Sequence, residues 1–157
     1  MNSILPMKEE NISGLALVEF IPASHVDTIE RPFNEKITSA ITLLSGKAWF
    51  SLAYTQETSP FICNEEKSSA GSMFHASVSG FTPKMQQATA AVFNEMREEL
   101  FIVKVTDHNG NIRIAGTKKE PLKFSYSEST QAEFGRRQGY AWAFTRDLRD
   151  APPYYDI

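Results

Sequence analysis

The chain of 157 residues is 41% hydrophobic and 22% charged, and its 11 Phe, 5 Tyr and 2 Trp supply ample material for a core. This composition excludes a globally disordered chain and fits a single domain spanning residues 1–157. The 19 acidic and 16 basic residues are mixed along the chain and give a net charge of −3, so nucleic acid is not expected as a partner. One cysteine excludes an internal disulfide framework and suits a reducing compartment, so we expect a cytoplasmic protein.

Residues 1–13 form a polar leader that we expect to be flexible. This leader contains no apolar run of signal-peptide length. No stretch of the chain approaches the roughly 18 apolar residues that cross a bilayer, so no membrane partner is expected.

The N-terminal half contains three segments with the composition of β-strands. Residues 14–21 read as a strand that is stopped by Pro22, because proline cannot donate to a sheet ladder. Residues 37–44 and 47–55 are β-like runs separated by Ser45-Gly46, a short break of the kind that hairpins use. These patterns predict a strand followed by a hairpin.

A loop, a strand and a helix are expected next. Residues 56–71 mix Pro, Ser, Asn, Glu and Gly, which predicts a long surface loop. Alternation of apolar and polar residues returns at 72–81 and predicts a half-buried strand. Thr82 suits the N-cap and Pro83 the first helical position, and apolar residues then recur at helical spacing, so we expect a helix at about 83–98.

Strands dominate the C-terminal half. Residues 100–106 and 112–115 flank Asn109-Gly110, which suits a two-residue type I′ turn, so a hairpin is expected there. Residues 122–126 and 140–145 alternate in the manner of two further strands.

The order of these elements predicts the fold class. Residues 147–157 contain two prolines followed by two tyrosines, so this tail is expected to stay extended. About seven or eight strands with one inserted helix predict a β-dominated α+β domain. Its expected architecture is an antiparallel β-sandwich or barrel with the helix packed on the outside.

No catalytic, cofactor or metal motif is present, so we expect no such site residues and a protein that is not an enzyme. Cys63 and His75 are close in sequence, but no family signature surrounds the thiol, which favours a packing cysteine. The three histidines, His25, His75 and His108, lack metal-binding spacing. The alternative of an unrecognised enzyme would be indicated if two or more of these side chains shared one cleft: His25, His75, Glu133 and Asp147.

The other charged residues are interpreted as solvated surface. Segment 107–111 lacks the glycine position of a calcium loop, and Lys118 stands where the closing glutamate belongs. The basic pairs 118–119 and 136–137 are too sparse to form a phosphate-binding stripe. Glycoside chemistry needs two carboxylates at a defined distance, and no motif in the sequence singles out such a pair. The glutamates that would be available are Glu65, Glu66, Glu95, Glu98, Glu99 and Glu133.

Tyr140, Trp142 and Phe144 form a bulky aromatic face on one expected strand. Alternating aromatic residues of this kind are most often core. The alternative is a small-ligand or carbohydrate-binding β module in which the three rings line a pocket.

Stretches of the C-terminal half resemble small structural proteins encoded in the tail modules of phages and prophages. They are the SGFTP segment at 79–83, residues 100–127 with their D-x-N-G turn and G-T-x-x-x-P-L-x-F return, and the aromatic strand with its Pro-Tyr end at 136–155. The resemblance implies a tail-tube or tail-completion β-sandwich or barrel that assembles with itself and with other structural proteins. It also implies a non-enzymatic role and a place in the virion.

Overall fold

The computed structural model describes residue 4, residues 11–133 and residues 135–157. One α-helix and one large sheet make a β-dominated α+β fold of this described part, which confirms the expected class. The elements in chain order are β1 (Leu15–Pro22), a 3-10 turn η1 (Ala23–His25), β2 (Val26–Thr28), β3 (Lys36–Ile37), β4 (Thr42–Leu43), β5 (Phe50–Ser51), β6 (Phe61–Ser68), β7 (Gly71–Pro83), α1 (Gln87–Met96), β8 (Leu100–Asp107), β9 (Ile112–Ala115), β10 (Leu122–Ser129), β11 (Gly139–Leu148) and β12 (Tyr154–Tyr155).

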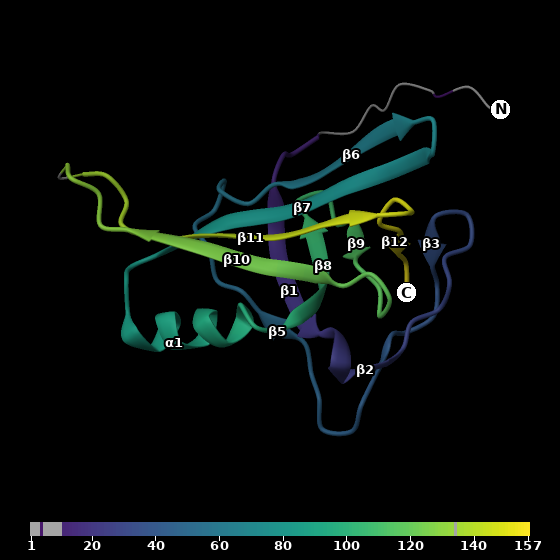
Figure 1. Ribbon diagram of the computed structural model, residues 1–157, viewed down its shortest axis with the longest axis horizontal. Helices are drawn as coiled ribbons and strands as arrows, with labels where there is room; N and C mark the ends of the chain where they lie inside the picture. Colours follow the sequence, from purple (N-terminus) through teal and green to yellow (C-terminus); the bar gives the residue numbers. More distant parts are fainter. Residues whose placement is uncertain (1–3, 5–10, 134) are drawn as a thin grey trace.

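The large sheet is curled, so that β7, β10 and β11 run across the direction of β1, β8 and β9 (Figure 1). β8 is the branch point, because β1 pairs with one side of it while β9 and β10 pair with the other. From β10 the sheet continues through β11 and β7 to β6, and from β9 through β12 to β3.

Residues 52–60 bring the two ends of this curve together. The amide of Leu15 in β1 donates to the carbonyl of Ser59 (3.1 Å). The amide of Thr55 donates to the carbonyl of Phe81 in β7 (2.8 Å). Because these bonds join β1 to β7 through one connecting segment, the sheet approaches a closed barrel more than an open sandwich.

Apolar side chains pack on both faces of β8. Phe101 and Val103 point into the larger, aromatic cluster, whereas Ile102 points into a smaller aliphatic cluster beneath β2 and β4. Helix α1 closes part of the larger cluster with Phe93, whose ring centroid lies 5.2 Å from that of Tyr140. Burial of both faces explains why β8 is an almost continuous apolar run.

The helix begins later than the sequence predicts. β7 continues through Pro83, and α1 starts after Gln86, which has extended backbone and no side-chain cap. The expected N-cap, Thr82, is a strand residue whose hydroxyl donates to the Ala53 carbonyl (2.7 Å) and accepts from the indole N–H of Trp142 (3.0 Å). These tertiary bonds outweigh the local capping preference.

The expected long loop at 56–71 is wrong, because residues 61–68 form strand β6 and pair with β7 along their whole length. The hairpin expected across 37–55 is also wrong. β4 pairs with β2, whereas β5 pairs with β1, where Phe50 stacks on Phe20 with centroids 5.7 Å apart. The contact of Phe50 with the buried ring of Phe20 favours pairing of β5 with β1, and β5 does not pair with β4, the strand before it in the sequence.

The β8–β9 hairpin is confirmed, but its turn is not type I′. A type I′ turn needs a positive φ at two residues, and here only Gly110 has one (+84°). The Asp107 carboxylate sets the turn instead, accepting from the amides of Asn109 and Asn111 (2.8 Å each). These bonds to the aspartate hold the turn without the positive φ at Asn109 that the prediction assumed.

The tail at 147–157, which is expected to stay extended, is in part paired with the sheet. Asp147 and Leu148 complete β11, and β12 pairs antiparallel with β9 and parallel with β3. Most of the leader expected at 1–13 lies outside the described residues, but Ile12 is held by its backbone to the Asn109 side chain. Among the described residues, no helix combines the length and hydropathy needed to cross a membrane.

Candidate functional site at the hairpin edge

The β6–β7 hairpin forms one end of the large sheet (Figure 1). β7 is the longest strand, with 13 residues, and pairs with β11 along ten of its positions. β6 is eight residues long and pairs with β7 alone among the described residues. Its other edge is therefore a row of backbone groups available for pairing with another strand.

The register of the hairpin identifies which residues present these groups. The Ser79 amide donates to the Pro60 carbonyl (3.3 Å), so this pair is hydrogen-bonded across the ladder. In an antiparallel ladder the hydrogen-bonded pairs alternate with pairs whose N–H and C=O point away. Counting along β6, the outward groups belong to Phe61, Cys63, Glu65 and Lys67.

The side chains at this edge mix charge with exposed apolar surface. Ile62 and Met73 share the outer face of the hairpin and are 46% and 47% exposed. Glu65 and Lys67 lie on the opposite face, where their charged groups are 3.9 Å apart. Charges on an edge strand prevent indiscriminate pairing, so a partner strand must also match the charge pattern.

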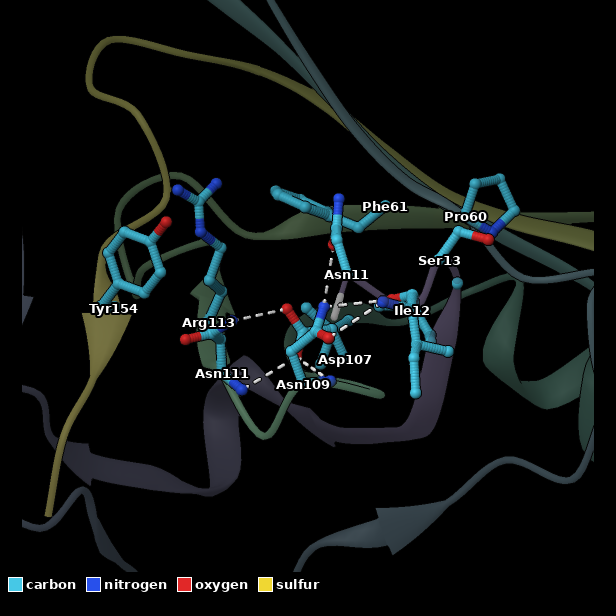
Figure 2. A pocket seen from close by; sticks show the side chains of 13 residues that line it. Asn11, Ile12, Ser13, Pro60, Phe61, Asp107, Asn109, Asn111, Arg113 and Tyr154 are labelled. Carbon is cyan, nitrogen blue, oxygen red and sulfur yellow. Dashed lines mark hydrogen bonds between the residues drawn. The ribbon is translucent and has the colours of Figure 1, made fainter. Parts of the chain in front are cut away.

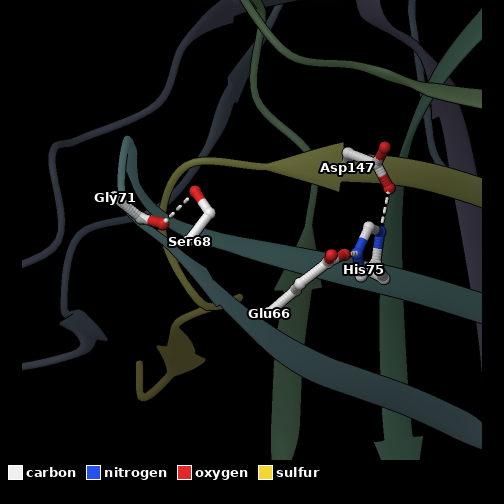
Figure 3. A network of polar contacts seen from close by, with 5 residues as sticks. All are labelled: Glu66, Ser68, Gly71, His75 and Asp147. Carbon is white, nitrogen blue, oxygen red and sulfur yellow. Dashed lines mark hydrogen bonds and ion pairs between the residues drawn. The ribbon is translucent and has the colours of Figure 1, made fainter.

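His75 joins three strands on the outer face (Figure 3). Its Nε2 lies 2.7 Å from Glu66 of β6, and its Nδ1 is hydrogen-bonded to Asp147 of β11. Asp147 is the direct cross-strand neighbour of His75, and Glu66 reaches it from the other side. The hydrogen bond to Glu66, and next the one to Asp147, raise the pKa of His75 above its ordinary value because the carboxylates favour the imidazolium.

This arrangement meets part of the condition set for an enzyme, because His75 and Asp147 converge. However, both imidazole nitrogens are engaged by carboxylates, which leaves neither free to take a proton from a nucleophile. The two nitrogens also face opposite ways, so the three side chains do not converge on one point as metal ligands must. In the described part of the chain, no cluster of three or more His, Cys, Asp or Glu side chains is arranged to hold a metal ion.

The thiol of Cys63, the nucleophile considered from the sequence, lies on the opposite face of the hairpin from His75. Cys63 pairs with Ala76 and points to the inner face, whereas Asn64 and His75 point to the outer face. Cys63 is half-buried, and burial raises the pKa of its thiol while the charge of Arg113 opposes the rise. The packing interpretation of Cys63 fits this environment.

The remaining candidates are dispersed. His25 lies in η1 and His108 in the β8–β9 turn. Glu133 pairs with Arg136 at 2.9 Å, in the connection between β10 and β11. Lys118 donates to the backbone of Asp27 (2.9 Å). These contacts fit the solvated-surface interpretation.

The aromatic face of β11 is core, as the sequence predicts. Tyr140, Trp142 and Phe144 are each at most 2% exposed. The Trp142 ring packs edge-on against Tyr54 and Phe144, with centroids 6.2 and 5.9 Å away. These rings therefore offer no open face on which a sugar could stack.

Comparison with known proteins gives no relative for this chain. No protein-family model matches it, and no curated protein or solved structure matches it. A proposal of function therefore rests on the geometry of the β6–β7 hairpin and on the expected resemblance of stretches within residues 79–155 to phage tail components.

Proposed function

We propose that the chain is a non-enzymatic structural protein that acts by self-association, of the kind found in the tail modules of phages and prophages. The observation that carries this proposal is the outer edge of β6, eight residues long and unpaired by any described residue. Strand addition to such an edge supplies a regular set of main-chain hydrogen bonds without a ligand or a catalytic group.

The composition of the edge supports a selective contact. Ile62 and Met73 add apolar surface beside the edge, while Glu65 and Lys67 exclude partners of unmatched charge. If β6 pairs with β6 of a second copy, the contact closes as a two-fold dimer. If β6 adds to a different surface of the next copy, the contact is heterologous and builds a ring or a tube. The tail-component proposal requires the second arrangement.

The test is the mass in solution by light scattering across a hundredfold concentration range. We expect a discrete ring or growth into tubes. A mass that remains monomeric at every concentration would overturn the proposal of self-association. A dimer that grows no further would overturn the tail-component assignment while leaving the edge as the contact.

A matched pair of variants at position 65 tests whether the edge forms the contact. Glu65→Pro removes one outward N–H and places a ring where a partner strand would lie, yet leaves the bonds to β7 intact. Glu65→Ala removes the same carboxylate and keeps the N–H. We expect association at least about tenfold weaker for the proline variant than for the alanine variant. Equal association of the two would show that β6 is not the contact.

A further inference from the structure

A cavity of about 440 Å³ lies where the ends of four segments meet (Figure 2). Residues 11–15 form one wall, Pro60 and Phe61 a second, the β8–β9 hairpin a third, and Tyr154 of β12 the fourth. A volume of this size is within the range of small-molecule sites in proteins.

Arg113 is the one cationic side chain among the described residues that line the cavity. Its guanidinium carbon lies 4.2 Å from the ring centroid of Tyr154 and 5.6 Å from that of Phe61. Figure 2 shows the guanidinium rising between these two rings. The face of an aromatic ring attracts a guanidinium, but the ring does not satisfy the hydrogen-bonding capacity of the guanidinium N–H groups.

Three other polar side chains that line the cavity, those of Asp107, Asn109 and Asn111, are already hydrogen-bonded. The Asp107 carboxylate accepts from two amides of its own turn and from the Asn111 side chain (2.9 Å). The Asn109 side chain is bonded to the backbone of Ile12 in both directions (3.0 Å each). Within the described part of the chain, no hydrogen bond or ion pair reaches the guanidinium of Arg113.

The N–H groups of Arg113 are therefore open, as far as the described residues go, to a ligand that supplies coplanar acceptors. A carboxylate meets this requirement, because its two oxygens match the fork of the guanidinium. Beside Arg113 the wall is apolar, formed by Leu15, Phe61 and Val105 of the main core cluster. A carboxylate that carries an apolar group fills both parts of the cavity.

We propose that this cavity binds a carboxylate attached to an apolar body, with Arg113 as the anion partner and Phe61 and Tyr154 as the walls that orient it. This inference does not depend on self-association through β6. The carboxylate has two possible sources, a free small acid or the C-terminus of a peptide, and the experiment separates them.

The probes are 3-phenylpropionate and its neutral amide, and a short peptide ending in phenylalanine with a free or an amidated C-terminus. Binding is measured by titration while the side-chain Nε–H signal of Arg113 is followed by NMR. We expect each acid to bind about tenfold to a hundredfold more tightly than its amide and to shift the Arg113 signal. Tighter binding of the free acid indicates a small-molecule site, and tighter binding of the peptide indicates a chain terminus.

Two variants test the role of Arg113. Arg113→Gln removes the charge, and Arg113→Lys keeps the charge but removes the fork and much of the stacking. We expect both to weaken binding of the acid, the glutamine variant more, with the amide unaffected. The proposal is overturned if acid and amide bind wild type equally or neither binds. It is also overturned if inorganic phosphate binds as tightly as the acid, or if a folded Arg113→Gln protein retains wild-type affinity.

Discussion

Replacement of Gly80 by alanine tests whether Trp142 is fixed in the core. Gly80 lies directly opposite Trp142 in the β7–β11 ladder, and its φ is in a range open to any residue. A Cβ at this position would lie 2.5 and 2.9 Å from two atoms of the indole ring. The indole cannot move aside freely, because its N–H is bonded to Thr82. We expect Gly80→Ala to lower the free energy of unfolding by about 1–3 kcal/mol through overpacking.

A double-mutant cycle isolates this contact. Trp142→Phe removes the ring atoms nearest Gly80 and the bond to Thr82, and we expect it alone to cost about 1–3 kcal/mol. Because the smaller ring leaves room for the new methyl group, the double variant should be more stable than the sum of the single effects by at least about 1 kcal/mol. The assay is urea unfolding followed by far-UV circular dichroism, which does not depend on the tryptophan. Additive effects within about 0.5 kcal/mol would refute the clash.

Two further predictions concern the His75 contact and the helix. The pKa of His75 is raised in the folded protein, so its contribution to stability is complete below about pH 6.5 and is lost as the pH rises through the folded pKa. Urea unfolding should therefore show wild type losing more stability than His75→Gln between about pH 6 and about pH 9, and parallel curves would contradict the assignment. Phe93→Ala should cost about 3–5 kcal/mol, because Phe93 is one of two buried residues that anchor α1. A loss similar to that of the exposed control Val92→Ala would show that the helix is not docked through this ring.

The strands with a buried face could be predicted from the sequence. β1, β8, β9 and β11 alternate or are apolar throughout because each contacts at least one core cluster. β6 could not be predicted, because its only half-buried side chains are Phe61 and Cys63, and an edge strand with so little burial has no hydrophobic period. Its pairing is supplied by β7 rather than by its own composition.

The candidate site residues were also only partly predictable from the sequence. Residue type alone marked His75 and Asp147 as worth watching, but they are 72 residues apart and only the strand register makes them neighbours. Glu66 could not be assigned to them because β6 itself was missed. The sequence did not mark Arg113 as a site residue, since its two aromatic walls come from β6, which was expected to be a loop, and β12, which was expected to be an extended tail.

The position of His75 connects the titration of its imidazole to the proposed pairing of a partner strand with β6. In the described part of the chain β6 has one neighbouring strand, so its conformation depends on cross-strand contacts more than that of an interior strand does. His75 ties β6 through Glu66 to β11 through Asp147, and so holds the edge strand to the body of the sheet across β7. A strand held in its extended conformation loses less entropy when a partner strand adds to it. Glu66, His75 and Asp147 therefore hold β6 in place through side-chain contacts on the outer face. These contacts do not use the outward backbone groups with which a partner strand would pair.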